Sequence, residues 1–194
     1  MIDLSAFKGI IFDMDGTLVD SMAAHIEAWR LACEEFGYPF DSDFQYSLGG
    51  VPSLATVDMM NHRYGKNYSP KNVAAFKQRA YEGLSHTPTL IQSTLAVFNY
   101  YKSIMPIAIG TGSDKKHAKW VLSKHGILAH LSALVTADDV NEGKPHPETF
   151  LKAAETMGIA PKDCVVFEDT EMGRQAAVDG GMTCILVENG HIQA

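Results

Sequence analysis

The stretch GIIFDMDGT, residues 9–17, decides the fold of this chain of 194 residues. Its first four residues form a short apolar run of the kind that makes a buried strand. Asp13, Asp15 and Thr17 follow that run at once. In sheets of parallel strands, ligands bind at the carboxyl ends of the strands. The stretch therefore predicts a buried strand with a functional site at its end.

Four further runs are rich in β-branched and aliphatic residues and resemble the first. They do not alternate between apolar and polar residues, which is typical of a parallel sheet covered on both faces. Helical patterns ending at Gly126 and Gly158 separate them. We expect an α/β fold, a doubly wound, Rossmann-like parallel sheet of five strands. The predicted strands are Gly9–Phe12, Pro106–Ile109, Ala133–Thr136, Cys164–Phe167 and Thr183–Val187.

The first two strands are unusually far apart, and the pattern between them is helical. Apolar residues at helical spacing stop at Gly37 and again at Gly65, and a third helix is predicted to begin at Ser69-Pro70. The chain length suits one domain that carries an insert. The expected organisation is an α/β core of residues 1–19 and 88–194, with a small helical cap of residues 20–87 inserted after the first strand.

Composition excludes several classes of protein. A net charge of −7 without a block of Lys or Arg disfavours a nucleic-acid partner. No apolar run approaches the roughly 18 residues of a membrane span, and the N-terminus does not resemble a signal peptide. The three cysteines, Cys33, Cys164 and Cys184, form no CxxC pair and are expected to be buried free thiols. We therefore expect a cytoplasmic protein without nucleic-acid or membrane partners.

Polar residues also follow three of the other predicted strands. Gly110-Thr111-Gly112-Ser113 offers hydroxyls and backbone N–H groups at a helix start, which suit a phosphate. Gly143-Lys144-Pro145 follows the third strand, and the adjacent carboxylates Glu168-Asp169 follow the fourth. Carboxylates gathered in one crevice repel one another unless a hard divalent cation lies among them. This arrangement predicts a bound Mg²⁺.

Spacing rules out three other sites. An EF-hand loop starting at Asp13 would need glycine at Leu18 and glutamate at Ala24. A dinucleotide fingerprint at Gly110 would need glycine in place of Lys115. Gly143-Lys144 lacks the first glycine of a phosphate-binding P-loop.

Taken together, the four motifs resemble those of the haloacid dehalogenase-like phosphohydrolase superfamily, in order and spacing. The resemblance covers the whole chain and is nearest to the β-phosphoglucomutase-like and fructose-1-phosphate phosphatase subgroup. It implies that Asp13 is the nucleophile and Asp15 the general acid and base. It further implies that Thr111 and Lys144 neutralise the phosphoryl oxygens. The implied Mg²⁺ ligands are Asp13, Asp15 through its backbone carbonyl, Asp169 and Glu168.

The implied substrate-binding residues are His25, Gly50, Gly112 and Ser113. Two points stay open. His25 borders the apolar stripe of its helix, so a packed interfacial histidine is the alternative to a site residue. Adjacent strand residues face opposite ways, so Glu168 or Asp169 could be structural, and Asp169 is the preferred ligand.

The cap loop over residues 47–53 bears on the reaction. The mutases that the chain resembles carry a lysine and an arginine there, where this sequence has Gly49 and Ser53. We expect a phosphatase acting on a small sugar or polyol monophosphate, as a monomer or weak dimer, with Gly49 and Gly50 leaving room for an uncharged sugar end. The alternatives are a phosphomutase that uses Lys77 or Arg79, and a non-catalytic phospho-ligand binder.

Overall fold

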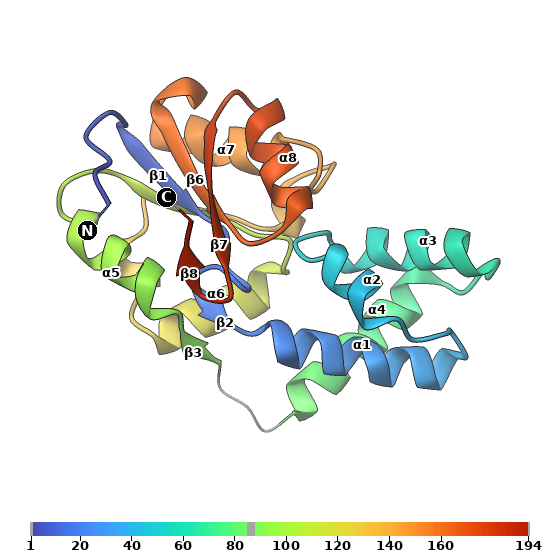
Figure 1. The fold of residues 1–194 in the computed structure, drawn as a ribbon. Helices are drawn as coiled ribbons and strands as arrows, with labels where there is room; N and C mark the ends of the chain where they lie inside the picture. Colours follow the sequence, from blue (N-terminus) through green and yellow to red (C-terminus); the bar gives the residue numbers. More distant parts are fainter. Residues whose placement is uncertain (1, 85–87, 194) are drawn as a thin grey trace.

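A computed structural model describes residues 2–84 and 88–193. Its main sheet has six strands in the order β5-β4-β1-β6-β7-β8 (Figure 1). Five of them are parallel, and their order doubles back at β1. The strands of this sheet are β1 Gly9–Phe12, β4 Ile107–Gly110, β5 Ala133–Val135, β6 Cys164–Glu168, β7 Thr183–Glu188 and β8 His191–Ile192.

The predicted α/β fold with five parallel strands is confirmed. Strand β1 lies between β4 and β6, with Phe12 level with Ile109 and with Phe167. All four of its residues are buried, as a central parallel strand requires. Strand β8 was not predicted, because it has two residues and pairs antiparallel with β7. A segment of that length carries no periodic signal.

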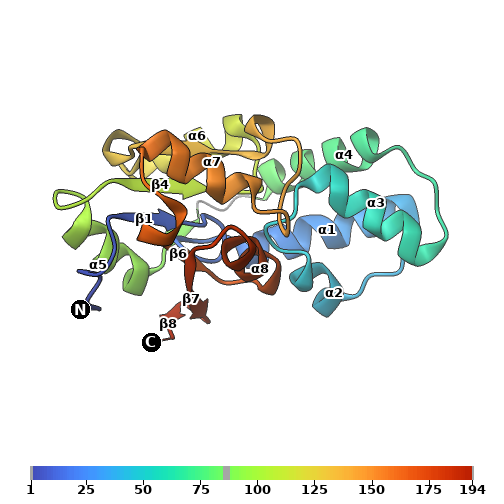
Figure 2. The ribbon, with the colours of Figure 1, turned by 90° about the horizontal axis from the view of Figure 1, so that it is seen from above.

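Helices cover both faces of the sheet. On one face, Phe12 and Ile109 pack with residues of α5 and α6. On the other, Ile11 and Val166 pack with residues of α7 and α8. Figure 2 looks down on this layered arrangement. The core helices are α5 Gln92–Tyr101, α6 Lys115–Lys124, α7 Glu148–Met157 and α8 Glu171–Asp179, with 3-10 turns at Leu128–His130, Ala137–Asp139 and Pro161–Asp163.

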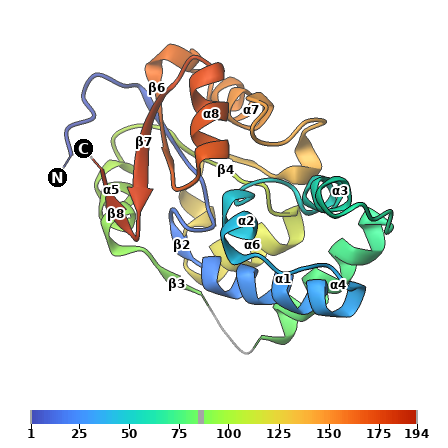
Figure 3. The same ribbon diagram turned by 45° about the vertical axis from the view of Figure 1, so that its right-hand side comes forward.

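Four helices of the insert lie at one end of the core (Figures 1 and 3). They have a hydrophobic cluster of their own, in which Trp29, Val57, Met60 and Val73 are buried. Two predicted helix ends are confirmed, because α1 ends before Gly37 and α3 ends before Gly65. Both glycines have a left-handed backbone. The helices are α1 Met22–Phe36, α2 Ser42–Ser47, α3 Ser53–Tyr64 and α4 Pro70–Gly83.

The chain leaves and re-enters the core through a short two-stranded ribbon. Strand β2, Val19–Asp20, pairs antiparallel with β3, Thr89–Leu90. The proposed boundaries of the cap, residues 20 and 87, lie at this ribbon and in the segment 85–87, which is outside the described residues. The division into core and cap stays a prediction.

Two further expectations concern cysteines and membranes. Cys33 and Cys164 are buried free thiols as predicted, whereas Cys184 is only half-buried because it lies on β7 toward the edge of the sheet. Among the described helices, none has the length and hydropathy needed to cross a bilayer.

Replacing Phe12 tests the packing of the hydrophobic core at the centre of the sheet. Its ring stacks on that of Phe167 with centroids 4.9 Å apart, and it is fully buried. We expect Phe12→Ala to lower the free energy of unfolding by about 3–5 kcal/mol, because it leaves a cavity at the sheet centre. Urea unfolding followed by circular dichroism measures this. The exposed Ile104→Ala is the control, and a loss below about 1 kcal/mol at Phe12 would contradict the packing described.

Candidate active site

Three of the predicted site residues form one buried ion network. The Lys144 ammonium donates to Asp13 Oδ1 at 2.6 Å and to Glu168 Oε2 at 2.8 Å. The side chains of Lys144 and Glu168 are fully buried and that of Asp13 nearly so. The residues come from the ends of β1 and β6 and from the loop before α7, so the topology brings together groups up to 155 positions apart.

Both carboxylate oxygens of Glu168 accept hydrogen bonds. Its Oε1 accepts hydrogen bonds from the backbone N–H groups of Asp169 and Thr170 and from the Thr170 hydroxyl. Its Oε2 accepts from Lys144. The sequence left open whether Glu168 or Asp169 is structural. The hydrogen bonds of Glu168 show that its carboxylate joins Lys144 to the loop after β6, whatever its role toward a metal.

Asp169 is placed differently. Its Oδ1 accepts from the Thr17 hydroxyl at 3.0 Å, whereas its Oδ2 is buried without a hydrogen-bond partner. Gly16, with φ of +92°, lets the chain pass directly against this carboxylate, where any Cβ would collide with Oδ2. Oxygens of Asp13, Glu168 and Asp169 all lie within 4.8 Å of one another. An unpartnered oxygen within a carboxylate cluster fits a hard cation such as Mg²⁺.

The electrostatics agree with that fit. Burial, followed by the charge of Glu168, raises the pKa of Asp13 to about 8 and that of Asp169 to about 9. Burial lowers the pKa of Lys144, but Asp13 and Glu168 outweigh it and leave that pKa above its ordinary value. One lysine therefore cannot keep all three carboxylates ionised near neutral pH, and a divalent cation would let them ionise together.

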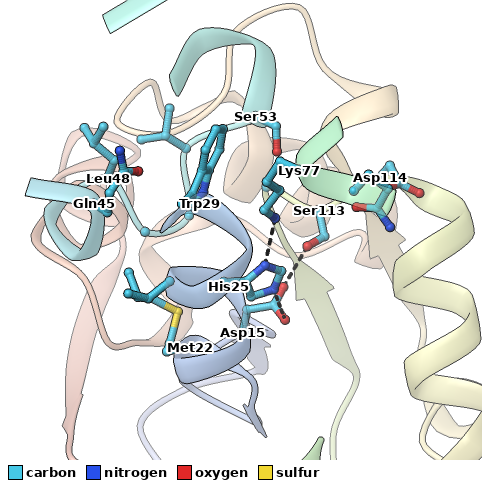
Figure 4. Close-up of a pocket in the computed structure, with 16 residues that line it drawn as sticks. Asp15, Met22, His25, Trp29, Gln45, Leu48, Ser53, Lys77, Ser113 and Asp114 are labelled. Atoms are coloured by element: carbon cyan, nitrogen blue, oxygen red, sulfur yellow. Dashed lines mark hydrogen bonds and ion pairs between the residues drawn. The ribbon is translucent and has the colours of Figure 1, made fainter. Parts of the chain in front are cut away.

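Asp15 lies apart from this network, in a second polar group (Figure 4). Its Oδ1 accepts from the Ser21 hydroxyl at 2.6 Å and contacts His25 Nε2 at 3.2 Å, and its Oδ2 accepts from the Ser113 hydroxyl at 2.7 Å. Burial raises the pKa of Asp15, but His25 outweighs it and leaves that pKa below its ordinary value. Asp15 is therefore ionised at neutral pH, and His25 contacts it, whereas the role of His25 toward a substrate stays a prediction.

Lys77 completes the group from the cap side. Its ammonium lies 2.8 Å from His25 Nδ1, so Nδ1 accepts and the ring proton is on Nε2, which faces Asp15. Burial, then the charge of Lys77, lowers the pKa of His25 to about 4, and burial lowers that of Lys77 to about 8. Helical spacing placed Lys77 on α4 but could not show that its side chain reaches α1.

The loop after β4 and the cap loop are in direct contact. Ser113 N–H donates to Thr111 Oγ1 at 3.1 Å, which orders the loop over the end of β4. A Cβ on Gly112 would collide with the carbonyl oxygen of Gly50. Gly112 is therefore needed for this close approach.

The expectation that Gly49 and Gly50 leave room for a sugar end stays a prediction, but on the side where a Cβ would stand that space is already filled. A Cβ on Gly49 would lie 2.7 Å from Thr170 Cγ2, and one on Gly50 would lie 3.2 Å from Lys144 Cδ. Core side chains occupy that space. Glycine is required there because the loop packs tightly against the core.

A cavity of about 70 Å³ lies between the core loops and the cap. Asp15 lines it together with His25, Gly50, Gly112 and Ser113, and that the last four bind a substrate stays a prediction. Sequence reasoning considered Ser53 and Lys77 among the polar residues that the cap contributes but missed Gln45 and Gln78, because single side chains on helices carry no motif. All four residues line the cavity: Gln45 from α2, Ser53 from α3, and Lys77 and Gln78 from α4.

Comparisons with known proteins agree with the fold and the motifs. Residues 7–181 match the haloacid dehalogenase-like hydrolase family. The chain is 33% identical to the fructose-1-phosphate phosphatase YqaB of Escherichia coli, over 92% of this chain and 95% of that protein. It is 30% identical to the β-phosphoglucomutase of Bacillus subtilis, over 94% of this chain and 84% of that protein. The chain belongs to the haloacid dehalogenase-like hydrolases.

A solved structure of a named enzyme shares the fold of this chain. The β-phosphoglucomutase of Clostridium difficile is similar with a TM-score of 0.82 and 26% identity, over 94% of this chain and 85% of that one. The predicted family, the fold and the assignment as a phosphatase of this hydrolase family are confirmed.

The carboxylate cluster predicts a pH-dependent effect of Mg²⁺ on stability. Protons hold Asp13 and Asp169 neutral up to about pH 8–9 in the folded protein and must leave before a cation binds. Saturating Mg²⁺ should raise the melting temperature by about 5–10 °C, and by more at pH 8 than at pH 6. Calorimetry at both pH values measures this. Asp169→Asn should remove most of the gain, and the exposed Asp179→Asn should keep it.

Proposed function

We propose that the chain is a Mg²⁺-dependent phosphatase that hydrolyses a small sugar or polyol monophosphate through an aspartyl-phosphate intermediate. The observation that carries the proposal is the pairing of two differently placed carboxylates. Asp13 lies against Lys144 in the buried network, and Asp15 lies in the cavity among hydroxyls and an imidazole. Such a division gives one carboxylate for attack and another for proton transfer.

Asp13 is positioned as the nucleophile. Its backbone N–H donates to the Phe167 carbonyl at 2.9 Å, which fixes it between β1 and β6. Lys144 holds Oδ1, and the second carboxylate oxygen forms the bond to phosphorus while the bond from phosphorus to the leaving-group oxygen breaks. Lys144, Thr111 and the N–H groups beside Gly112 would stabilise charge on the phosphoryl oxygens.

Asp15 is positioned for proton transfer. Ser21, His25 and Ser113 orient its carboxylate toward the cavity. The negative charge of a bound phosphate would raise the pKa of Asp15, so that its carboxyl takes a proton from solvent and gives it to the leaving alkoxide. Ionised again by that transfer, Asp15 accepts a proton from the water that hydrolyses the aspartyl-phosphate. His25, with its ring proton on Nε2, and Lys77 keep the carboxylate in this orientation.

The metal site would be made by Asp13, Asp169, the Asp15 backbone carbonyl and, next to them, Glu168. Mg²⁺ supplies positive charge that lets an anionic carboxylate approach an anionic phosphate. The unpartnered Oδ2 of Asp169 supports this assignment.

Water is favoured over a second sugar phosphate as the acceptor. Within the described residues, Lys77 is the cavity's sole lysine or arginine, and it is engaged with His25. Asp114 is also in the lining, and its charge disfavours a second phosphate. Arg79, considered with Lys77 as an anchor, is exposed and lies over the Phe76 ring. The cavity is below the roughly 300 Å³ typical of ligand pockets, so substrate entry requires the cap loop to move.

The phosphomutase remains the second candidate, because Lys77 does reach the cavity. A cytoplasmic location, a monomer or weak dimer, and a small phosphorylated metabolite as partner complete the proposal. The relatives named phosphatases and mutases of sugar phosphates support that class of substrate.

Asp13→Asn tests the nucleophile. We expect turnover of a sugar monophosphate to fall by roughly 10³-fold or more, because no aspartyl-phosphate can form. Steady-state phosphate release measures the loss, and circular dichroism checks the fold. The exposed Asp43→Asn is the matched control. Activity of Asp13→Asn within about tenfold of wild type would reject this mechanism.

The products distinguish the two candidates. With β-glucose 1-phosphate and a catalytic amount of the bisphosphate, we expect free phosphate and little glucose 6-phosphate. Coupled assays for both products measure the ratio. Faster formation of glucose 6-phosphate would establish the mutase, and Lys77→Met should then abolish the isomerisation.

A further inference from the structure

His117, on the first turns of α6, is the feature that the proposed mechanism does not use. Its side chain is 93% buried, since it is 7% exposed, yet its Nε2 has no hydrogen-bond partner. A buried imidazole nitrogen without a partner is costly unless something binds there. Asp114 holds the start of α6 by accepting from the His117 backbone N–H, so the position of this residue is fixed.

His117 lies beside the polar group of the cavity. A ligand atom of each of Asp15, His25 and His117 falls within 4.8 Å of the other two. The two imidazole rings have centroids 6.0 Å apart and stand nearly perpendicular, at 78°. Two imidazoles on one Zn²⁺, with bonds of about 2.1 Å, have centroids roughly 5–6 Å apart.

The remaining distances suit the same geometry. Asp15 Oδ1 and His25 Nε2 are 3.2 Å apart, and neighbouring ligands of a tetrahedral Zn²⁺ lie roughly 3.3 Å apart. The Tyr81 ring stacks on His25 at 4.4 Å and meets His117 edge-on at 4.9 Å, so it holds both imidazoles in place.

The three residues also lie between two cavities. Asp15 and His25 line the cavity of the proposed active site, whereas His117 and Tyr81 line a separate cavity of about 330 Å³ with Trp120. The side chain of His117 therefore borders a second cavity as well as the polar group around Asp15.

We propose that Asp15, His25 and His117 form a second metal site, selective for borderline ions such as Zn²⁺ and Co²⁺ over Mg²⁺, whose occupancy inhibits the enzyme. Two imidazoles and one carboxylate favour such ions, whereas Mg²⁺ favours oxygen ligands. Inhibition rests on the proposed function, because the ion would take the Asp15 carboxylate needed for proton transfer. The binding itself does not.

One charge opposes binding. Lys77 donates to His25 Nδ1, and an ion on Nε2 moves the ring proton to Nδ1, so the ammonium must turn away. Removing this positive charge should strengthen binding. Lys77→Met is therefore expected to bind Co²⁺ several-fold more tightly, and unchanged affinity would argue against a site at His25.

Co²⁺ titration in saturating Mg²⁺ is the direct test. Visible absorption should show one Co²⁺ per chain with nitrogen coordination. His117→Phe, which keeps an aromatic ring, should weaken binding by about 100-fold. His117→Gln serves if the phenylalanine variant does not fold. The control His62→Ala removes a histidine on α3 and should bind normally, as should Asp169→Asn, which affects only the Mg²⁺ site. Equal binding by wild type and both His117 variants would overturn the site.

Phosphate release in the same Mg²⁺ tests the inhibition. Zn²⁺ should reduce wild-type activity at least tenfold and the activity of His117→Phe less than twofold, with similar activity of both in its absence. Equal inhibition of the two would overturn the coupling to catalysis. Co²⁺ binding that depends on His117 supports the metal site even in a chain that releases no phosphate, so failure of the proposed function would be recognised separately.

Discussion

The buried contacts of Lys144 with Asp13 and Glu168 are the constraint on which the site depends. They join the loop before α7 to the ends of β1 and β6. A buried ion pair stabilises a fold only when the remaining donors and acceptors of both partners also form hydrogen bonds. Glu168 meets this condition through Asp169, Thr170 and Lys144, whereas burial and the charge of Glu168 raise the pKa values of Asp13 and Asp169. A cation bound among these carboxylates would therefore let Asp13 and Asp169 ionise together with Glu168.

The second polar group shows how the cap takes part in the same site. Asp15 belongs to the core, His25 to α1 and Lys77 to α4, and they form a continuous line of hydrogen bonds. The line sets the tautomer of His25, because the ammonium of Lys77 can only donate. The position of the cap is therefore coupled to the orientation of the Asp15 carboxylate.

Much of the fold could be predicted because its signals are local. The five parallel strands are uninterrupted apolar runs, and the cap helices end at Gly37 and Gly65, where a left-handed residue is required. Strand β8 and the ribbon of β2 and β3 could not be predicted. Each strand has two residues, and pairing rather than periodicity defines it.

The sequence by itself determined which residues stand at the strand ends, and hence Asp13, Asp15, Thr111, Lys144 and Asp169 as the candidate site. Only the tertiary structure decided which partner each side chain meets. Glu168 bonds to Lys144, Lys77 reaches a histidine 52 residues away, and Gly50 serves close packing. The physical reason is that such contacts depend on how the cap docks on the core, and no local spacing encodes that arrangement.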